Sequence, residues 1–163
     1  LLAACARDES PPAAGRTVDA DTSAAAPTAC ALVTAETGKA ALGEAVKEPV
    51  EQIINPGSAE MAALSQCTIQ ASATPGKTLS VFFRVSPVAD NRPESVRSTL
   101  TESGVAVEDV AGVGDAAFWS GSELHVFFGG NRYLIIGVRG LDDAAALEQA
   151  KAVAREAKVP VAS

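Results

Sequence analysis

Alternating apolar and polar positions mark a pair of β-strands in the middle of the chain. Apolar side chains recur at every second position around residues 67–71 and again over residues 79–85. This is the period that places side chains on one face of a strand. Thr74-Pro75-Gly76-Lys77 separates the two segments with residues that favour a tight turn. The pattern predicts a β-hairpin whose first strand begins at Cys67.

Three more strands are predicted in the last third of the sequence. Segments 116–119, 123–128 and 132–138 are rich in aromatic and β-branched residues. Ser120-Gly121-Ser122 and Gly129-Gly130-Asn131 separate them, and both linkers suit short turns. The three segments therefore predict an antiparallel meander.

Helix signals flank the predicted strands. Thr34 is a favourable N-cap and Gly43 a favourable stop for a first helix. A second helix is expected to begin near Pro93 and to end before Gly104. A third is expected over residues 142–158, where apolar residues recur at helical spacing behind two aspartates that can cap it.

The segment between the first helix and the hairpin has no single prediction. Pro49 and the Asn55-Pro56-Gly57 turn interrupt residues 46–66, in which residues 58–64 suit at most one helical turn. The predicted order is α-ββ-α-βββ-α. Short connections favour antiparallel pairing, so we expect an α+β fold with a mostly antiparallel sheet of about five strands and helices packed on it.

The second face of this sheet carries more apolar residues than a water-exposed face should. One face receives the regularly alternating aliphatic and aromatic residues. The other receives Phe82, Phe127, Tyr133 and Ile135, with Arg84 and His125 nearby. Two interpretations stay open. A helix, for example residues 142–158, covers this face, or the face lines a groove for an apolar ligand or a protein partner.

Charge and hydropathy limit the possible partners. The net charge is −7 and the pI is about 4.7, which disfavours nucleic acid because phosphate binding needs a basic surface. No apolar stretch approaches the length of a membrane span. Attachment to a membrane would therefore have to be covalent.

The start of the sequence offers such an attachment. Leu2-Ala3-Ala4-Cys5 resembles the lipobox of bacterial lipoproteins at all four positions, and the resemblance implies that Cys5 carries lipid. The alternative is an accidental match in an alanine-rich start. Residues 6–28 are rich in Pro, Ser, Thr, Asp and Ala and predict a flexible tether. We expect residues 1–29 to be lipobox remnant and tether, and residues 30–163 to form the globular domain.

The two remaining cysteines suggest a disulfide. With Cys5 assigned to lipid, Cys30 and Cys67 are left as a pair, which an oxidising cell envelope would join. Two buried free thiols are the alternative. A metal site is disfavoured, because two cysteines and one distant histidine lack ligand spacing.

Several short motifs occur in an order that resembles a known family. These are Cys30-Ala31-Leu32-Val33-Thr34, Ala41-Leu42-Gly43, Cys67 and the segment Val113-Gly114-Asp115-Ala116-Ala117-Phe118-Trp119. Over residues 30–157 the chain resembles an actinobacterial-type lipoprotein family of unknown function. The resemblance implies a secreted, lipid-anchored α+β domain and brings no catalytic residues.

No motif predicts catalysis or a cofactor. Gly112 and Gly114 fit a glycine-rich nucleotide pattern, but a strand follows them where a helix would be needed. We therefore interpret Gly112, Gly114, Asp115 and Trp119 as a structural turn with a tryptophan anchor. His125 is the only histidine and lacks a nucleophile elbow beside it.

The functional expectation is a non-enzymatic lipoprotein outside the cytoplasm. It would be held on a membrane of the cell envelope by its lipid and would bind a small apolar ligand or a protein partner. A structural or assembly subunit of an envelope complex is the alternative, and an uncharacterised hydrolase is the third choice.

Overall fold

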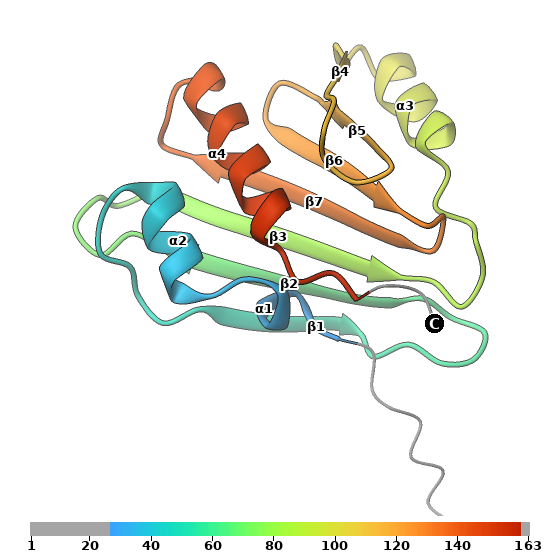
Figure 1. Ribbon diagram of the computed structural model, residues 1–163, viewed down its shortest axis with the longest axis horizontal. Helices are drawn as coiled ribbons and strands as arrows, with labels where there is room; N and C mark the ends of the chain where they lie inside the picture. Colours follow the sequence, from blue (N-terminus) through green and yellow to red (C-terminus); the bar gives the residue numbers. More distant parts are fainter. Residues whose placement is uncertain (1–26, 161–163) are drawn as a thin grey trace, which may run out of the picture.

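Seven antiparallel strands form one sheet in the computed structural model of the protein, which describes residues 27–160 (Figure 1). The order across the sheet is β1-β2-β3-β7-β6-β5-β4. The strands are β1 (Val50–Asn55), β2 (Ala63–Gln70), β3 (Thr78–Val85), β4 (Glu108–Asp109), β5 (Ala116–Trp119), β6 (Glu123–Phe128) and β7 (Arg132–Arg139). The helices are α1 (Ala29–Leu32), α2 (Ala35–Leu42), α3 (Pro93–Glu102) and α4 (Asp143–Glu156). The α+β class and the antiparallel sheet are confirmed.

The helix ends follow the predicted signals. The Thr34 side chain accepts a hydrogen bond from the backbone N–H of Thr37, and Gly43 ends α2 with φ 70°. Pro93 begins α3 in the first turn, where a missing backbone N–H costs nothing. Asp142 caps α4 by accepting from the backbone N–H of Ala145. Local capping chemistry therefore sets where these helices begin and end.

The predicted number of strands and order of elements were wrong in detail. The sheet has seven strands rather than five, because β1 and the two-residue β4 were not predicted. Pro49 and Asn55-Pro56-Gly57 bracket β1 instead of preventing it. A proline at the end of an edge strand costs little, because no ladder bond is lost there. Residues 58–62 form a loop without a helical turn, and β2 begins four residues before Cys67.

One face of the sheet, called here the first face, holds the main core. Helices α1, α2 and α4 pack on it (Figure 1). The central side chains on this face are fully buried, which confirms the predicted alternation. They include Ile69, Leu79, Val81, Phe83, Leu124, Val126, Leu134 and Ile136.

The second face is covered by a different helix from the one suggested. Helix α4 lies on the first face, so residues 142–158 do not cover the second. Instead α3 packs Val96 and Leu100 against an aromatic cluster over β5, β6 and β7. The chain must travel from β3 to the far edge to begin β4, so the connection crosses three strands, and α3 makes that crossing. The half formed by β1, β2 and β3 carries Gln66, Thr68 and Ser80 outward on this face.

A disulfide joins the N-terminal helical segment to the sheet. Cys30 in α1 and Cys67 in β2 are bonded across 37 residues, with their Cα atoms 4.9 Å apart. This confirms the predicted pairing. Cys67 is fully buried on the first face, so the bond fixes α1 against the centre of β2.

We predict that replacing both cysteines with alanine lowers the free energy of unfolding by about 4 kcal/mol, the loop-closure entropy expected for a loop of this length. Urea denaturation of the oxidised wild type and the double variant would measure the difference. A difference below about 1 kcal/mol would contradict the assigned role of the bond.

Candidate functional site

The predicted lipidation site cannot be placed. Cys5 and residues 1–26 lie outside the described part of the chain. The described part of the chain begins with Pro27 and Thr28, directly before α1.

Four of the six side chains predicted for the second face come together beneath α3. Phe127 and Tyr133 stack with ring centroids 4.5 Å apart, and Phe118 stacks on His125 at 4.9 Å. Ile135 packs against the same group. The cluster is closed from above, because α3 lies on it and the guanidinium of Arg97 sits 4.9 Å from the centre of the Phe118 ring.

The other two predicted residues lie outside this cluster. Phe82 is half-buried opposite Ile135 in the β3–β7 pair. Arg84 forms an ion pair with Asp90 at 2.8 Å, and it also donates to Asn91 in the loop after β3. This ion pair holds the pKa of the Asp90 carboxyl well below its usual range. Arg84 is therefore engaged in a local loop contact.

A row of three hydrogen-bonded side chains runs through the cluster. His125 Nδ1 lies 2.5 Å from the Tyr133 hydroxyl, and His125 Nε2 lies 3.2 Å from Ser120 Oγ. Ser120 Oγ donates to the backbone carbonyl of Glu123. Ser120 therefore accepts from Nε2–H, which leaves Nδ1 to accept the Tyr133 proton.

This row is not arranged to activate a nucleophile. In a catalytic triad the serine proton points to histidine, and a carboxylate orients the ring. Here the Ser120 proton points to a carbonyl, and a tyrosine hydroxyl takes the place of the acid. Burial lowers the pKa of His125 to about 4 and raises that of Tyr133 above its usual value. Both side chains are neutral at pH 7, and the row stabilises the buried cluster.

We predict that His125 makes the free energy of unfolding depend on pH between its folded pKa of about 4 and its unfolded pKa near 6.5. Between its lowered folded pKa of about 4 and its unfolded value near 6.5, the unfolded state binds more protons. Stability is therefore highest above pH 6.5 and falls as the pH drops towards 4.

Urea denaturation should show a loss of about 2 kcal/mol between pH 7 and pH 5. His125→Gln, which cannot titrate, should be less stable at pH 7 but should lose this part of the pH dependence. The charged side chains beside this row include Glu123, whose charge acts on Tyr133, and Arg97, which lies over the Phe118 ring. An equal pH slope in both proteins would show that His125 is not buried as a neutral ring.

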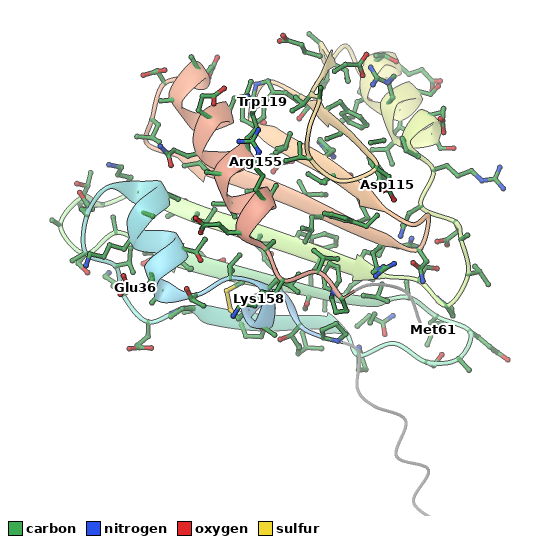
Figure 2. The ribbon with its side chains drawn as sticks, in the orientation of Figure 1. Glu36, Met61, Asp115, Trp119, Arg155 and Lys158 are labelled. Atoms are coloured by element: carbon green, nitrogen blue, oxygen red, sulfur yellow. A yellow bond between two sulfur atoms is a disulfide. The ribbon has the colours of Figure 1, made fainter. Side chains whose placement is uncertain are left out.

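The glycine-rich segment before β5 forms a tight corner. Gly112 and Gly114 have φ values of 80° and 58°. The Asp115 carboxylate accepts a 2.6 Å hydrogen bond from the backbone N–H of Gly129, in the β6–β7 turn. Trp119, four residues later, is buried on the first face, and Figure 2 labels both side chains. The segment links two turns and anchors β5.

We predict a large difference between two alanine variants in this corner. Both glycines have positive φ, but only Gly114 is crowded: a Cβ atom there would lie 2.6 Å from Phe127 O and from Val126 Cγ1. Gly112 has open space at the same position. Gly112→Ala should cost about 1 kcal/mol, from backbone strain alone. Gly114→Ala should cost roughly 1–3 kcal/mol more. Thermal or urea denaturation measures both, and equal losses would mean that Gly114 does not pack against β6.

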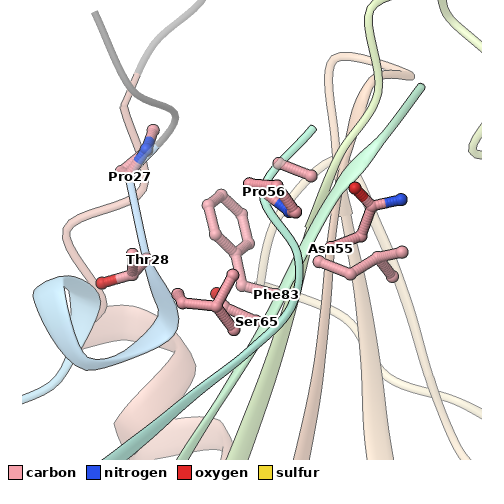
Figure 3. A pocket seen from close by; sticks show the side chains of 9 residues that line it. Pro27, Thr28, Asn55, Pro56, Ser65 and Phe83 are labelled. Atoms are coloured by element: carbon pink, nitrogen blue, oxygen red, sulfur yellow. The ribbon is translucent and has the colours of Figure 1, made fainter. Parts of the chain in front are cut away.

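An apolar cavity, which the sequence did not predict, lies on the first face. It is found where β1 ends and β2 begins. Its volume is about 200 Å³. Figure 3 shows the ring of Phe83 standing between Pro27 on one side and Pro56 on the other. The lining residues are Pro27, Thr28, Ile53, Asn55, Pro56, Ala63, Leu64, Ser65 and Phe83. Of its three polar side chains, Thr28, Asn55 and Ser65, the last two already accept hydrogen bonds from the backbone, Asn55 from Gly57 N–H and Ser65 from Ala29 N–H. The cavity therefore offers mainly hydrocarbon to a guest.

Strand β1 and the loop after it carry most of the exposed large apolar side chains. Five large apolar side chains are exposed among residues 27–160, and four belong to β1 or the loop after it. These four, called here the edge patch, are Val50, Ile53, Ile54 and Met61. Ile53 belongs to both the edge patch and the cavity wall. Exposed apolar side chains beside an apolar cavity, as at Ile53, are typical of a binding site.

Other kinds of site find no support in the described residues. Within residues 27–160 no three histidine, cysteine or acidic side chains are grouped so that they could hold a metal ion. No helix in this part of the chain is long and apolar enough to cross a membrane. Comparison with known proteins gives no match to a family model, a curated protein or a solved structure.

Proposed function

We propose that the protein is an extracytoplasmic lipoprotein, anchored in the cell envelope through a lipid on Cys5, that acts by binding and not by catalysis. The anchor rests on the lipobox-like Leu2-Ala3-Ala4-Cys5 and on the family resemblance in the sequence. The Cys30–Cys67 disulfide supports a compartment outside the cytoplasm, because such bonds persist mainly in oxidising environments.

The apolar cavity beside exposed Ile53 carries the binding part of the proposal. A cavity lined by hydrocarbon and flanked by an exposed apolar patch is the usual form of a recognition site. In the row of Ser120, His125 and Tyr133, the serine proton is bonded to a backbone carbonyl and not to the histidine. The serine is therefore not activated as a nucleophile, which favours binding over hydrolysis. The guest is a small apolar ligand or part of a protein partner.

Photo-crosslinking in the native envelope tests this proposal. A photoreactive side chain at Ile53 should give a covalent adduct with a lipid, a small molecule or a protein. The same group at exposed Ala73, in the β2–β3 turn at the other end of the sheet, should give none. Cys5→Ala should release the protein from membranes and abolish the Ile53 adduct.

Two results would contradict the proposal. Membrane retention of the Cys5→Ala variant would refute the lipid anchor. Equal labelling from Ile53 and Ala73, or no labelling from either, would refute a binding site at the cavity.

A further inference from the structure

The outer edge of β1 has no strand neighbour among the described residues. β1 lies at one end of the sheet and pairs only with β2. One side of its backbone therefore has unpaired N–H and C=O groups, which form a template for another strand. The groups that complement this edge best are those of an extended peptide.

The two edges of the sheet differ in a way that makes β1 the accessible one. β4, at the opposite edge, has only two residues, Glu108 and Asp109, and both are acidic. Short and charged edges resist pairing. β1 has six residues, no lysine and no proline, and all but Asn55 are exposed. Only its last residues are irregular, with a register shift between Ile53 and Asn55.

The side chains of β1 provide apolar contacts on both faces of this edge. Val50 lies opposite Thr68 on the second face, whereas Ile53 lies opposite Ser65 on the first. An added strand would place alternate residues beside each of them. Pro49 and Pro56 bracket the edge, so the added strand can pair over about six residues.

The cavity suits one side chain of such a strand better than a separate ligand. Sites for drug-sized molecules enclose about 300–1,000 Å³, whereas this cavity measures about 200 Å³. It lies next to the last residues of β1, with Ile53 and Asn55 in its wall. An apolar side chain near one end of an added strand could enter it as an anchor.

Charge indicates which peptides would fit. Residues 47–61 contain Glu48, Glu51 and Glu60 but only one basic residue, Lys47. The chain as a whole has a net charge of −7. A second copy of β1 would bring the same net acidic charge to the interface, and like charges there are unfavourable. The edge therefore favours a partner with basic residues over a second copy.

We propose that β1 binds an extended segment of another protein by strand addition, with alternating apolar and basic side chains and one apolar side chain in the cavity. The inference rests on the proposed binding function and specifies its ligand. It assigns Val50 and Ile53 to the contact.

The test uses the full chain and synthetic peptides enriched on it from a random peptide library. Enriched peptides should alternate apolar and basic residues. Their binding should slow amide hydrogen exchange in β1. Val50→Lys and Ile53→Lys should each weaken peptide binding by about tenfold or more, because lysine on an edge blocks pairing.

Val88→Lys is the matched control. Val88 is 62% exposed and Val50 is 64% exposed, so the same change is made at an equally open valine outside the edge patch. This variant should bind peptide within about twofold of the wild type, and all three variants should keep the melting temperature of the wild type.

Four results would overturn the inference. They are an absence of enriched peptides, slowed exchange at α3 instead of β1, equal loss of binding in Val88→Lys, and self-association that Val50→Lys abolishes. One further result separates the two proposals: Ile53 crosslinks to a lipid or small molecule in the envelope while peptides fail to bind. That result would refute strand addition and would still support the proposed binding function. If Ile53 gives no adduct, the binding function falls first.

Discussion

The antiparallel pairing of β3 with β7 joins two meanders into one sheet. The two strands run together over eight residue pairs, from Thr78–Arg139 to Val85–Arg132. On one side lie β2 and β1, and on the other lie β6, β5 and β4. Both strands are flanked on each side, so the central first-face side chains are fully buried, namely Leu79, Val81, Phe83, Leu134 and Ile136. Without this pairing neither meander would have enough covered surface to support the helices on the first face.

The position of α3 follows from the same pairing. Because β7 takes the place beside β3, the chain leaving β3 must begin its second meander at the far edge. The connecting helix then crosses β7, β6 and β5 on the second face and covers the row of Ser120, His125 and Tyr133. The crossing ends in the acidic, two-residue β4. One edge of the sheet is thereby short and acidic, while β1 at the other edge is longer and more apolar.

Local chemistry made much of the fold predictable. Thr34, Gly43, Pro93 and Asp142 each mark a helix end through a mechanism that acts within one turn. The strands of the second meander alternate clearly and are separated by glycine-rich turns, so β5 and β6 have the predicted bounds. The disulfide followed from the number of cysteines once one was assigned to lipid.

What could not be predicted depends on contacts between distant segments. β1 lacks a buried face, so its pattern has no regular alternation to mark it as a strand. The cavity gathers residues from four segments of the chain, of which Pro27, Ile53 and Phe83 are examples. None of them carries a motif. The second face was recognised as too apolar for solvent, but the helix that covers it depends on the pairing of β3 with β7, which local patterns do not encode.

An open apolar edge is costly for a protein to keep, because it invites unwanted pairing. Its persistence would be explained if a partner covers it in the cell, as proposed above. The loop that follows β1 holds Met61, the only methionine in the chain, which is exposed at this end of the sheet (Figure 2). Methionine is readily oxidised when exposed, so Met61 reports on whether a partner covers the loop that follows β1.

The most direct measurement is the rate of Met61 oxidation by hydroxyl radicals, in native envelope vesicles and in the purified protein. Labelling at Val88 in the same samples serves as the reference. If a partner covers this edge in the envelope, as proposed, Met61 is oxidised several-fold more slowly there than in the purified protein, with little change at Val88. Equal Met61 oxidation in both samples would contradict this proposal, because the edge would then be open in the native envelope too.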